Sequence, residues 1–327
     1  MIHVQNLRKT FKVVKRRGNA LKSFLRPEFA AVTALDGVSF DIARGEIVGY
    51  MGPNGAGKST SIKIMSGILV PDSGECIIGG RVPWKERREH VARLGVVFGQ
   101  RSQLWWDTPV LDSFELLRDI YSISADEYAR NLSLLCEALS IDQLLQTPVR
   151  QLSLGQRMRC EIAASLLHSP DILFLDEPTI GLDAVSKLAL RDFIKMINRE
   201  RGVTVCLTTH DTSDIDALCE RVMLIGKGRI LYDGGFGELK NNLAPERILT
   251  VQAAGADGES ISETLGMAGV ALVGAESGIL TLRVDTSVCA VPSVIARLSG
   301  ECDMSDIEVK ALAVDEIIAR LYTKFEI

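Results

Sequence analysis

The chain has 327 residues, of which 46% are hydrophobic and 24% charged, and its formal net charge is -5. This length suggests about two domains, and the composition is typical of a globular protein. The acidic balance argues against a protein that binds nucleic acid or acidic lipid through its overall charge. No charge-free run reaches the roughly 18 residues that span a bilayer. The positive charges near the N-terminus are not followed by the apolar run of a signal peptide. We therefore expect neither a transmembrane segment nor a signal peptide.

Short apolar runs alternate with longer amphipathic stretches over residues 1–240. The apolar runs predict strands at 46–51, 93–98, 171–176, 203–209 and 221–234, the last of them turning as a tight hairpin near 226–230. The amphipathic stretches predict helices near 58–67, 112–121, 128–139, 154–168 and 185–200. Strands that alternate with helices indicate an α/β fold with a mainly parallel sheet covered on both faces.

A break follows at 239–247, and the composition beyond it shifts toward Gly, Ala, Ser and Val. Residues 245–327 predict a small α+β domain, with strands at 248–253, 270–274, 278–285 and 305–311 and helices at 259–268, 290–299 and 314–323. This order fits a split βαβ unit. The domain carries no recognisable chemistry, so we interpret it as a structural, dimerising or regulatory accessory domain.

Residues 8–26 contain eight Lys or Arg residues and no acid. Such a stretch is either a solvated loop or a patch that contacts lipid headgroups or an acidic partner. Seven cysteines are scattered along the chain without a CxxC pair, which favours reduced core thiols over a metal site.

A glycine-rich loop follows the strand at 46–51 and precedes the helix at 58–67. Its sequence fits the G-x-x-x-x-G-K-[ST] pattern of phosphate-binding loops, with the nine residues Gly52, Pro53, Asn54, Gly55, Ala56, Gly57, Lys58, Ser59 and Thr60. Glycines let main-chain N–H groups turn toward phosphate oxygens, and the helix N-terminus adds a positive dipole. We expect Lys58 to reach the β- and γ-phosphates and the Ser59 hydroxyl to bind Mg²⁺.

Two acids follow the buried strand at 171–176. A carboxylate in this position points to the sheet edge where open α/β folds bind ligands, so we expect Asp176 to hold Mg²⁺. Glu177 should point elsewhere, toward the attacking water, as a general base. Taken without the phosphate loop, the pair would read as two solvated acids at a strand end.

Two further polar groups complete the pattern. His210 ends the strand at 203–209, where it is expected to bond the γ-phosphate, although an isolated histidine there would normally be structural. Ser153 caps the helix at 154–168, and Ser153 with Gly155 makes a second anion site at a helix N-terminus. One chain therefore carries two phosphate-binding helix ends.

These residues together resemble the ATP-binding subunits of ABC transporters. The stretch Leu152–Gln156, LSLGQ, is similar to the family's LSGGQ signature. Six elements stand in the family's order over about 160 residues: the phosphate loop 52–60, Gln100 as the Q-loop, the signature 152–156, the acids 176–177, the D-loop 181–183 and His210. The resemblance covers about residues 1–240 and implies an ABC-type P-loop core with a helical subdomain at about 101–168 and an antiparallel β subdomain.

The resemblance also implies how the residues act. Two such subunits, here two copies of the chain or a related pair, pack head to tail with ATP and Mg²⁺ between them. Ser153, Gly155 and Gln156 of one would contact the nucleotide of the other, and Asp183 would couple the two sites. Gln100 would sense Mg²⁺ and link the site to integral-membrane permease subunits, and Phe11 would stack on adenine. The catalytic residues would be Glu177, His210, Gln100 and Lys58. The chain would then lie at the cytoplasmic face of the cell membrane, and no nucleic acid is expected.

The sequence departs from the family's pattern at four places. Leu154 replaces a glycine, Ile180 replaces a small residue, and Gly99 is an extra glycine before the Q-loop. The basic segment 12–33 is an insertion after Phe11, which leaves open whether Phe11 stacks on adenine or packs in the core.

The segments around Gln100 and the signature resemble bacterial ATPases paired with type-two export permeases. Trp105 and Trp106 follow Gln100 in the region that faces the permease in this family, so they either line that contact or pack between subdomains. We therefore favour an export motor. ABC import, a soluble ABC-type ATPase that acts on nucleic acid or ribosomes, and a non-enzymatic nucleotide sensor are the alternatives. The single set of motifs argues against the soluble ATPase, and the presence of Glu177 and His210 argues against the non-enzymatic sensor.

Overall fold

A computed structural model describes residues 1–14, 29–99, 102–209, 211–243, 246–254, 266–276 and 278–311, with the separate positions 316, 320 and 323. The chain divides into two compact units, Met1–Phe236 and Gly237–Ile327, which are described one at a time. The first unit carries the sequence-predicted site residues.

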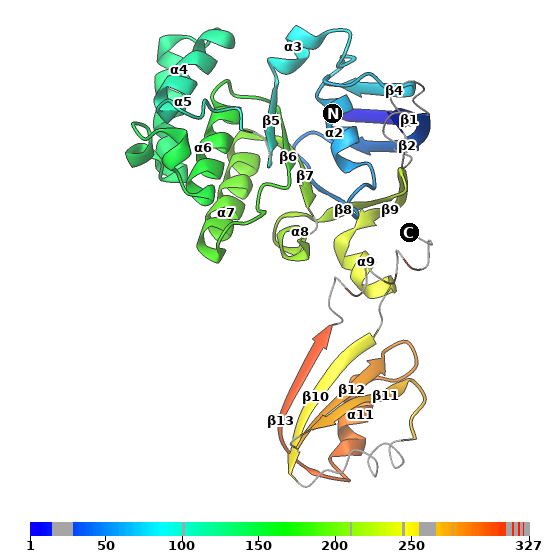
Figure 1. The fold of residues 1–327 in the computed structure, drawn as a ribbon. Helices are drawn as coiled ribbons and strands as arrows, with labels where there is room; N and C mark the ends of the chain where they lie inside the picture. The colour runs from blue at the N-terminus through cyan, green and yellow to red at the C-terminus, as the bar shows by residue number, and fades with distance from the viewer. Residues whose placement is uncertain are drawn as a thin grey trace, which may run out of the picture. The chain divides into compact units, whose positions relative to one another are not determined.

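A six-stranded sheet forms the centre of the first unit (Figure 1). Its strands, in spatial order, are β5 (Leu94–Phe98), β6 (Ile172–Asp176), β7 (Thr204–Thr209), β3 (Ile47–Met51), β8 (Arg221–Gly226) and β9 (Arg229–Gly235). The first five are parallel, and β9 pairs antiparallel with β8. Lys227 and Gly228 both have positive φ, as the tight turn of this hairpin requires. The predicted strands and hairpin are confirmed.

The helices connect these strands. They are α2 (Lys58–Met65), α3 (Arg87–Val91), α4 (Val110–Ile120), α5 (Ala125–Leu139), α6 (Leu154–Leu166), α7 (Ala184–Arg201) and α8 (Thr212–Leu218). Helix α9 (Phe236–Leu243) follows β9 in the chain, where the first unit ends and the second begins. The five predicted helices are found with boundaries within three residues of those expected. Helix α6 contacts α4 and α5, and Figure 1 shows these three together as a helical subdomain.

A second, antiparallel sheet covers α2. Its strands lie in the order β2 (Phe29–Ile42), β1 (Ile2–Val14) and β4 (Ser73–Ile78). Because Lys12 pairs with Ala31 and Val14 with Phe29, both ends of the predicted insertion 12–33 are strand, and only 15–28 lies outside the described residues. The expected insertion was therefore too long, since a basic, irregular composition concealed the strand ends.

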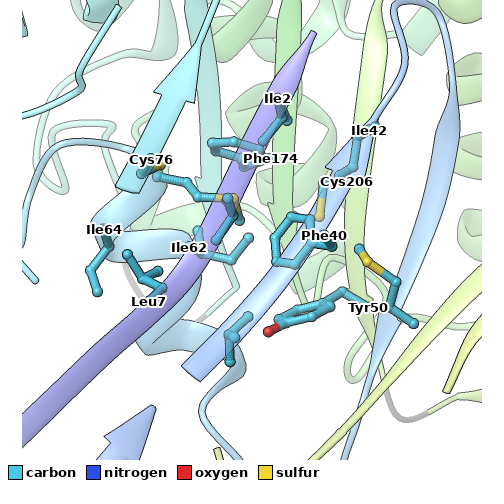
Figure 2. Close-up of a cluster of buried hydrophobic side chains, with 14 of the residues drawn as sticks. Ile2, Leu7, Phe40, Ile42, Tyr50, Ile62, Ile64, Cys76, Phe174 and Cys206 are labelled. Atoms are coloured by element: carbon cyan, nitrogen blue, oxygen red, sulfur yellow. The ribbon is translucent and has the colours of Figure 1, made fainter. Parts of the chain in front are cut away.

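Apolar side chains from both sheets and from α2 form one core. Figure 2 shows Ile2 and Phe40 of the antiparallel sheet beside Ile62 of α2, and beside Tyr50 and Phe174 of the central sheet. Burying a large aliphatic or aromatic side chain stabilises a fold by about 1.5–3 kcal/mol. This core therefore fixes α2, and the loop before it, against the ends of β3 and β6.

The second unit is a four-stranded antiparallel sheet in the order β11 (Val270–Glu276), β12 (Ile279–Asp285), β10 (Glu246–Ala254) and β13 (Asp303–Ala311). Helix α11 (Val291–Leu298) buries Val294 and Leu298 against Leu249 and Leu282 of the sheet. Strand β12 lies between β10 and β11, the arrangement of a split βαβ unit. The predicted helices at 259–268 and 314–323 lie largely outside the described residues.

The three sheets confirm the α/β fold class, with an antiparallel β subdomain in the first unit and an added α+β unit. None of the helices within the described ranges combines the length and the apolar character needed to cross a bilayer.

Candidate functional site

The loop Gly52–Thr60 joins the end of β3 to α2. Gly57 precedes α2 with φ of 115°, in the region that favours glycine, and a Cβ there would lie 2.6 Å from the carbonyl oxygen of Ala34. The glycine therefore lets the loop turn tightly against β2. This turn presents the main-chain N–H groups at the start of α2, which is the arrangement that binds phosphate.

Lys58 lies inside this loop. Its side chain is buried, and Nζ donates hydrogen bonds to the carbonyl oxygens of Gly52 at 2.6 Å and Pro53 at 3.2 Å. The same Nζ lies 3.9 Å from Oε1 of Glu177. Burial lowers the pKa of Lys58, an effect that the carboxylates of Glu177 and Asp176 oppose. The ammonium is thus held between the phosphate loop and the two acids, Asp176 predicted to bind Mg²⁺ and Glu177 predicted to be the general base.

A cavity of about 610 Å³ opens above the loop, a volume in the range of nucleotide and cofactor sites. Its walls contain nine of the predicted site residues: Pro53, Asn54, Gly55, Gly57, Lys58, Ser59, Thr60, Asp176 and Glu177. Gly52 and Ala56 are buried within the loop. Four described side chains that sequence reasoning did not place in the site also line it: Ala34, Lys63, Phe98 and Ile180.

Asp176 ends β6 beside the loop. Its Oδ1 accepts hydrogen bonds from Thr208 Oγ1 at 2.5 Å and from Ser59 Oγ at 3.4 Å. A carboxylate and a hydroxyl are the hard oxygen ligands that Mg²⁺ prefers, so these residues fit the ion. Within the described ranges, no group of three or more His, Cys, Asp or Glu side chains could hold a metal. An ion here would therefore take further ligands from phosphate and water.

The main chain turns sharply at Glu177. Its φ is 55°, which is uncommon for a residue other than glycine, and its N–H donates to the carbonyl oxygen of Thr208 at 2.9 Å. Gly99 packs against the same segment: its N–H donates to the Asp176 carbonyl oxygen at 2.8 Å, and a Cβ would lie 2.6 Å from the Glu177 carbonyl oxygen. The extra glycine in the sequence is therefore the residue that lets β5 approach the two acids.

Three further residues were predicted for the nucleotide site. Gln100 and His210 lie outside the described residues, so their predicted roles stay predictions. Phe11 is half-buried on β1, where it pairs with Val32 and lies 5.8 Å from Nζ of Lys9, and it is not among the residues that line the cavity.

The signature residues form a second cluster. Ser153 caps α6: its Oγ accepts from the Gln156 N–H at 3.2 Å, while Gln156 Oε1 accepts from the Ser153 N–H at 2.8 Å. This reciprocal capping fixes the helix N-terminus and the main-chain groups that would face an anion.

The D-loop packs on this cluster within the same chain. A Cβ on Gly155 would lie 2.7 Å from Ser186 Oγ, and a Cβ on Gly181 would lie 2.7 Å from Leu154 Cδ2. Hydrogen bonds from Ser186 lower the pKa of Asp183, which caps α7. Leu154, a departure from the family's pattern, therefore fills space over a D-loop glycine. Ser153, Gly155, Gln156 and Asp183 do not line the 610 Å³ cavity.

A parallel sheet with a glycine-rich phosphate loop, a lysine whose ammonium lies inside that loop, and two adjacent acids at a strand end defines a P-loop nucleoside triphosphatase. The ABC transporter family model matches residues 35–180. The daunorubicin resistance ATP-binding protein DrrA3 of Streptomyces coeruleorubidus is 31% identical over 290 residues, 88% of this chain and 90% of that protein. The linearmycin resistance ATP-binding protein LnrL of Bacillus subtilis (strain 168) is 29% identical over 295 residues, 89% of this chain and 93% of its own.

Among solved structures, the ATP-binding cassette MJ0796, in a dimeric post-hydrolysis state bound to ADP and Pi, matches with a TM-score of 0.61 and 27% identity over 72% of this chain and 98% of that chain. The chain belongs to the ATP-binding subunits of ABC transporters, and its activity is ATP hydrolysis. Subunits of this family work as dimers with membrane permeases.

Proposed function

We propose that this chain is the ATP-hydrolysing motor of a membrane exporter and that two copies clasp ATP between them. The observation that carries the proposal is the separation of two anion sites in one chain. Lys58, Asp176 and Glu177 line the cavity, whereas Ser153 and Gly155 do not. A second copy, packed head to tail, would bring its signature residues Ser153, Gly155 and Gln156 over the nucleotide, and Asp183 would link the two sites.

In this proposal different residues of the site bind phosphate, bind Mg²⁺ and accept the proton. The phosphate loop and Lys58 bind the β- and γ-phosphates, and Ser59 and Asp176, with Gln100, hold Mg²⁺. The ion would neutralise charge that develops on the transferred phosphoryl group. Glu177 accepts a proton from the attacking water, and His210 fixes the γ-phosphate. Phe11 remains our candidate for contact with adenine.

The names of two relatives support export as the direction of transport. LnrL and DrrA3 are named for resistance to linearmycin and to daunorubicin, which supports export of an antibiotic-like compound. We propose that the chain lies at the cytoplasmic face of the membrane and drives an integral-membrane permease. Trp105 and Trp106, about half-exposed just after the Q-loop, are the proposed contact with that permease.

The sandwich is tested by size-exclusion chromatography with ATP and Mg²⁺. Glu177→Gln should bind ATP, hydrolyse it at least about 10²-fold more slowly because the general base is lost, and elute as a dimer. Adding Ser153→Arg to this variant should return it to a monomer that still binds ATP. Glu200→Gln, an exposed acid at the end of α7, is the matched control and should turn over normally. A Glu177→Gln variant that stays monomeric at saturating ATP would contradict the proposal.

A further inference from the structure

Two ion pairs join α7 to the segment that follows β7. Lys187 Nζ lies 2.6 Å from Asp211 Oδ2, and Arg191 Nε lies 2.8 Å from Asp214 Oδ1. Lys187 and Arg191 are four residues apart and so lie on the same face of α7. Asp211 caps α8, and Asp214 lies in its first turn. The two pairs therefore fasten α8 to α7 along one seam.

The inner pair reaches the catalytic segment. Asp214 is fully buried, and its second oxygen, Oδ2, accepts a hydrogen bond from Thr179 Oγ1. Thr179 is also buried and follows Glu177 by two residues. A buried carboxylate without partners would be strongly destabilising, so Asp214 holds its Arg191 and Thr179 partners in fixed places. We call these five residues, Thr179, Lys187, Arg191, Asp211 and Asp214, the brace.

The outer pair shares a small cavity with Glu177. This cavity, of about 110 Å³, is lined by Glu177, Thr179, Ile180, Gly181, Lys187, Thr209 and Asp211. Glu177 and Ile180 also line the nucleotide cavity. The brace thus lies directly behind the residue that faces the nucleotide. Burial raises the pKa of Asp211, but the hydrogen bonds from Lys187 and Ser213 outweigh burial and lower this pKa to about 2.

Glu177 needs this support because its main chain is strained. A residue other than glycine keeps a left-handed φ only when its surroundings over-determine it. Thr208 fixes the N–H of Glu177, and the Thr179–Asp214 bond fixes the chain two residues later. The catalytic residue is therefore clamped on both sides along the chain.

We propose that Lys187 and Asp211 are positioning residues for ATP hydrolysis. Their ion pair fixes the orientation of the Glu177 carboxylate through the brace, without contact with the nucleotide. The inference rests on the proposed function, in which Glu177 is the general base, and not on the direction of transport. Because the pair lies behind Glu177 and away from the phosphate loop, it should govern turnover and leave nucleotide binding unchanged.

The test measures steady-state ATP hydrolysis by the purified full-length chain. Lys187→Met keeps the length of the side chain and removes its charge, and it should lower kcat about 10- to 100-fold, the cost of a small misplacement of a catalytic group, with KM for ATP within about two-fold. Lys187→Arg restores the ion pair and should recover most of the rate. Lys195→Met, an exposed lysine on the same helix, is the matched control and should leave kcat unchanged.

The pairing itself is tested by a double variant. Lys187→Met with Asp211→Asn should be about as slow as either single change, because both remove one interaction. Multiplied losses in the double variant, a raised KM with normal kcat in Lys187→Met, or an equal loss in Lys195→Met would each overturn the inference. Circular dichroism and thermal unfolding of each variant separate lost positioning from lost folding: a fall in kcat that only tracks the unfolded fraction also counts against it. Lys58→Ala, assayed in parallel, reports on the proposed nucleotide site independently.

Discussion

The main chain around Glu177 depends on a neighbour that has no side chain. Gly99 lies where any Cβ would be 2.6 Å from the carbonyl oxygen of Glu177 and 2.9 Å from that of Asp176. Both contacts are with main-chain atoms, which cannot rotate away as a flexible side chain can. Gly99, directly after β5, therefore sets how closely the two acids approach the nucleotide cavity.

Gly99→Ala should consequently impair both stability and turnover. The extra methyl group must push β5 or the acid segment aside, at a cost of about 1–3 kcal/mol. We expect kcat to fall about 10-fold or more as Glu177 moves. Urea unfolding and steady-state ATPase assays measure the two effects. Gly274→Ala, where the new Cβ meets nothing within 4 Å, is the control. Normal turnover in a fully folded Gly99→Ala variant would show that the contact is not critical.

At the scale of single residues, the sequence predicts those site residues whose chemical type recurs at a fixed spacing within one local motif. Lys58, Ser59, Asp176 and Glu177 could be assigned because a loop of fixed length, or a strand end, carries them to one place. Thr208 could not be assigned, since its role is to hold Asp176 and Glu177 across the sheet. The brace escaped prediction for the same reason: its partners come from three segments that meet only in the fold.

At the scale of elements, α6 is held to the rest of the first unit along its length. Near its middle, the buried Glu161 accepts hydrogen bonds from Ser102 Oγ and from the Gln103 N–H. Just beyond its end, the His168 ring stacks on Tyr121 with centroids 3.9 Å apart, and its Nε2–H donates to the Leu94 carbonyl oxygen at 3.2 Å. The helix that carries the signature is thus tied to the Q-loop segment and to β5.

The contact at His168 predicts a dependence on pH. Burial lowers the pKa of His168 to about 4, below its ordinary value of about 6.5. Between these values the unfolded chain binds a proton that the folded chain does not, so stability is full above about pH 6.5 and falls as the pH is lowered toward 4. At pH 5 the loss from this group would be at most about 2 kcal/mol.

His168→Gln should remove this component, because glutamine keeps a donor for Leu94 and cannot be charged. Urea unfolding at pH 7.5 and at pH 5 gives the free energy of unfolding for both proteins. The wild type should lose more stability between the two pH values than the variant, by up to about 2 kcal/mol. An equal loss in both proteins would assign the acid sensitivity to other groups.

The elements that sequence patterns predicted best are those with one regular hydrophobic pattern. Helices α5, α6 and α7 are amphipathic over several turns, and the parallel strands are short, nearly continuous apolar runs. The short helices α3 and α8 were missed, because five or seven residues give too little periodicity. Strands β1, β2 and β4 were not predicted individually, and only the family resemblance implied an antiparallel β subdomain. Near Lys12 the composition resembles a loop, whereas pairing across the hairpin of β1 and β2 makes this segment strand.

At the scale of the whole molecule, each unit has a hydrophobic core of its own. The first core joins the antiparallel sheet, α2 and the central sheet. The second is confined to β10, β12 and α11 with their neighbours, and includes Leu249, Leu280 and Val294. The described residues of the nucleotide cavity all belong to the first unit. We therefore interpret the second unit as an accessory domain that catalysis does not require.

Removing residues 245–327 tests this interpretation. The cut keeps Met1–Phe236, the whole of the first unit, with every side chain of its core, so it should not open that core. We expect the shortened chain to fold cooperatively, and to bind ATP and turn it over within about two-fold of the full chain, because every described residue that lines the cavity is kept. Titration with a fluorescent ATP analogue and a steady-state ATPase assay measure this, and circular dichroism verifies folding. A folded truncation that fails to bind nucleotide would show that the second unit takes part in the site.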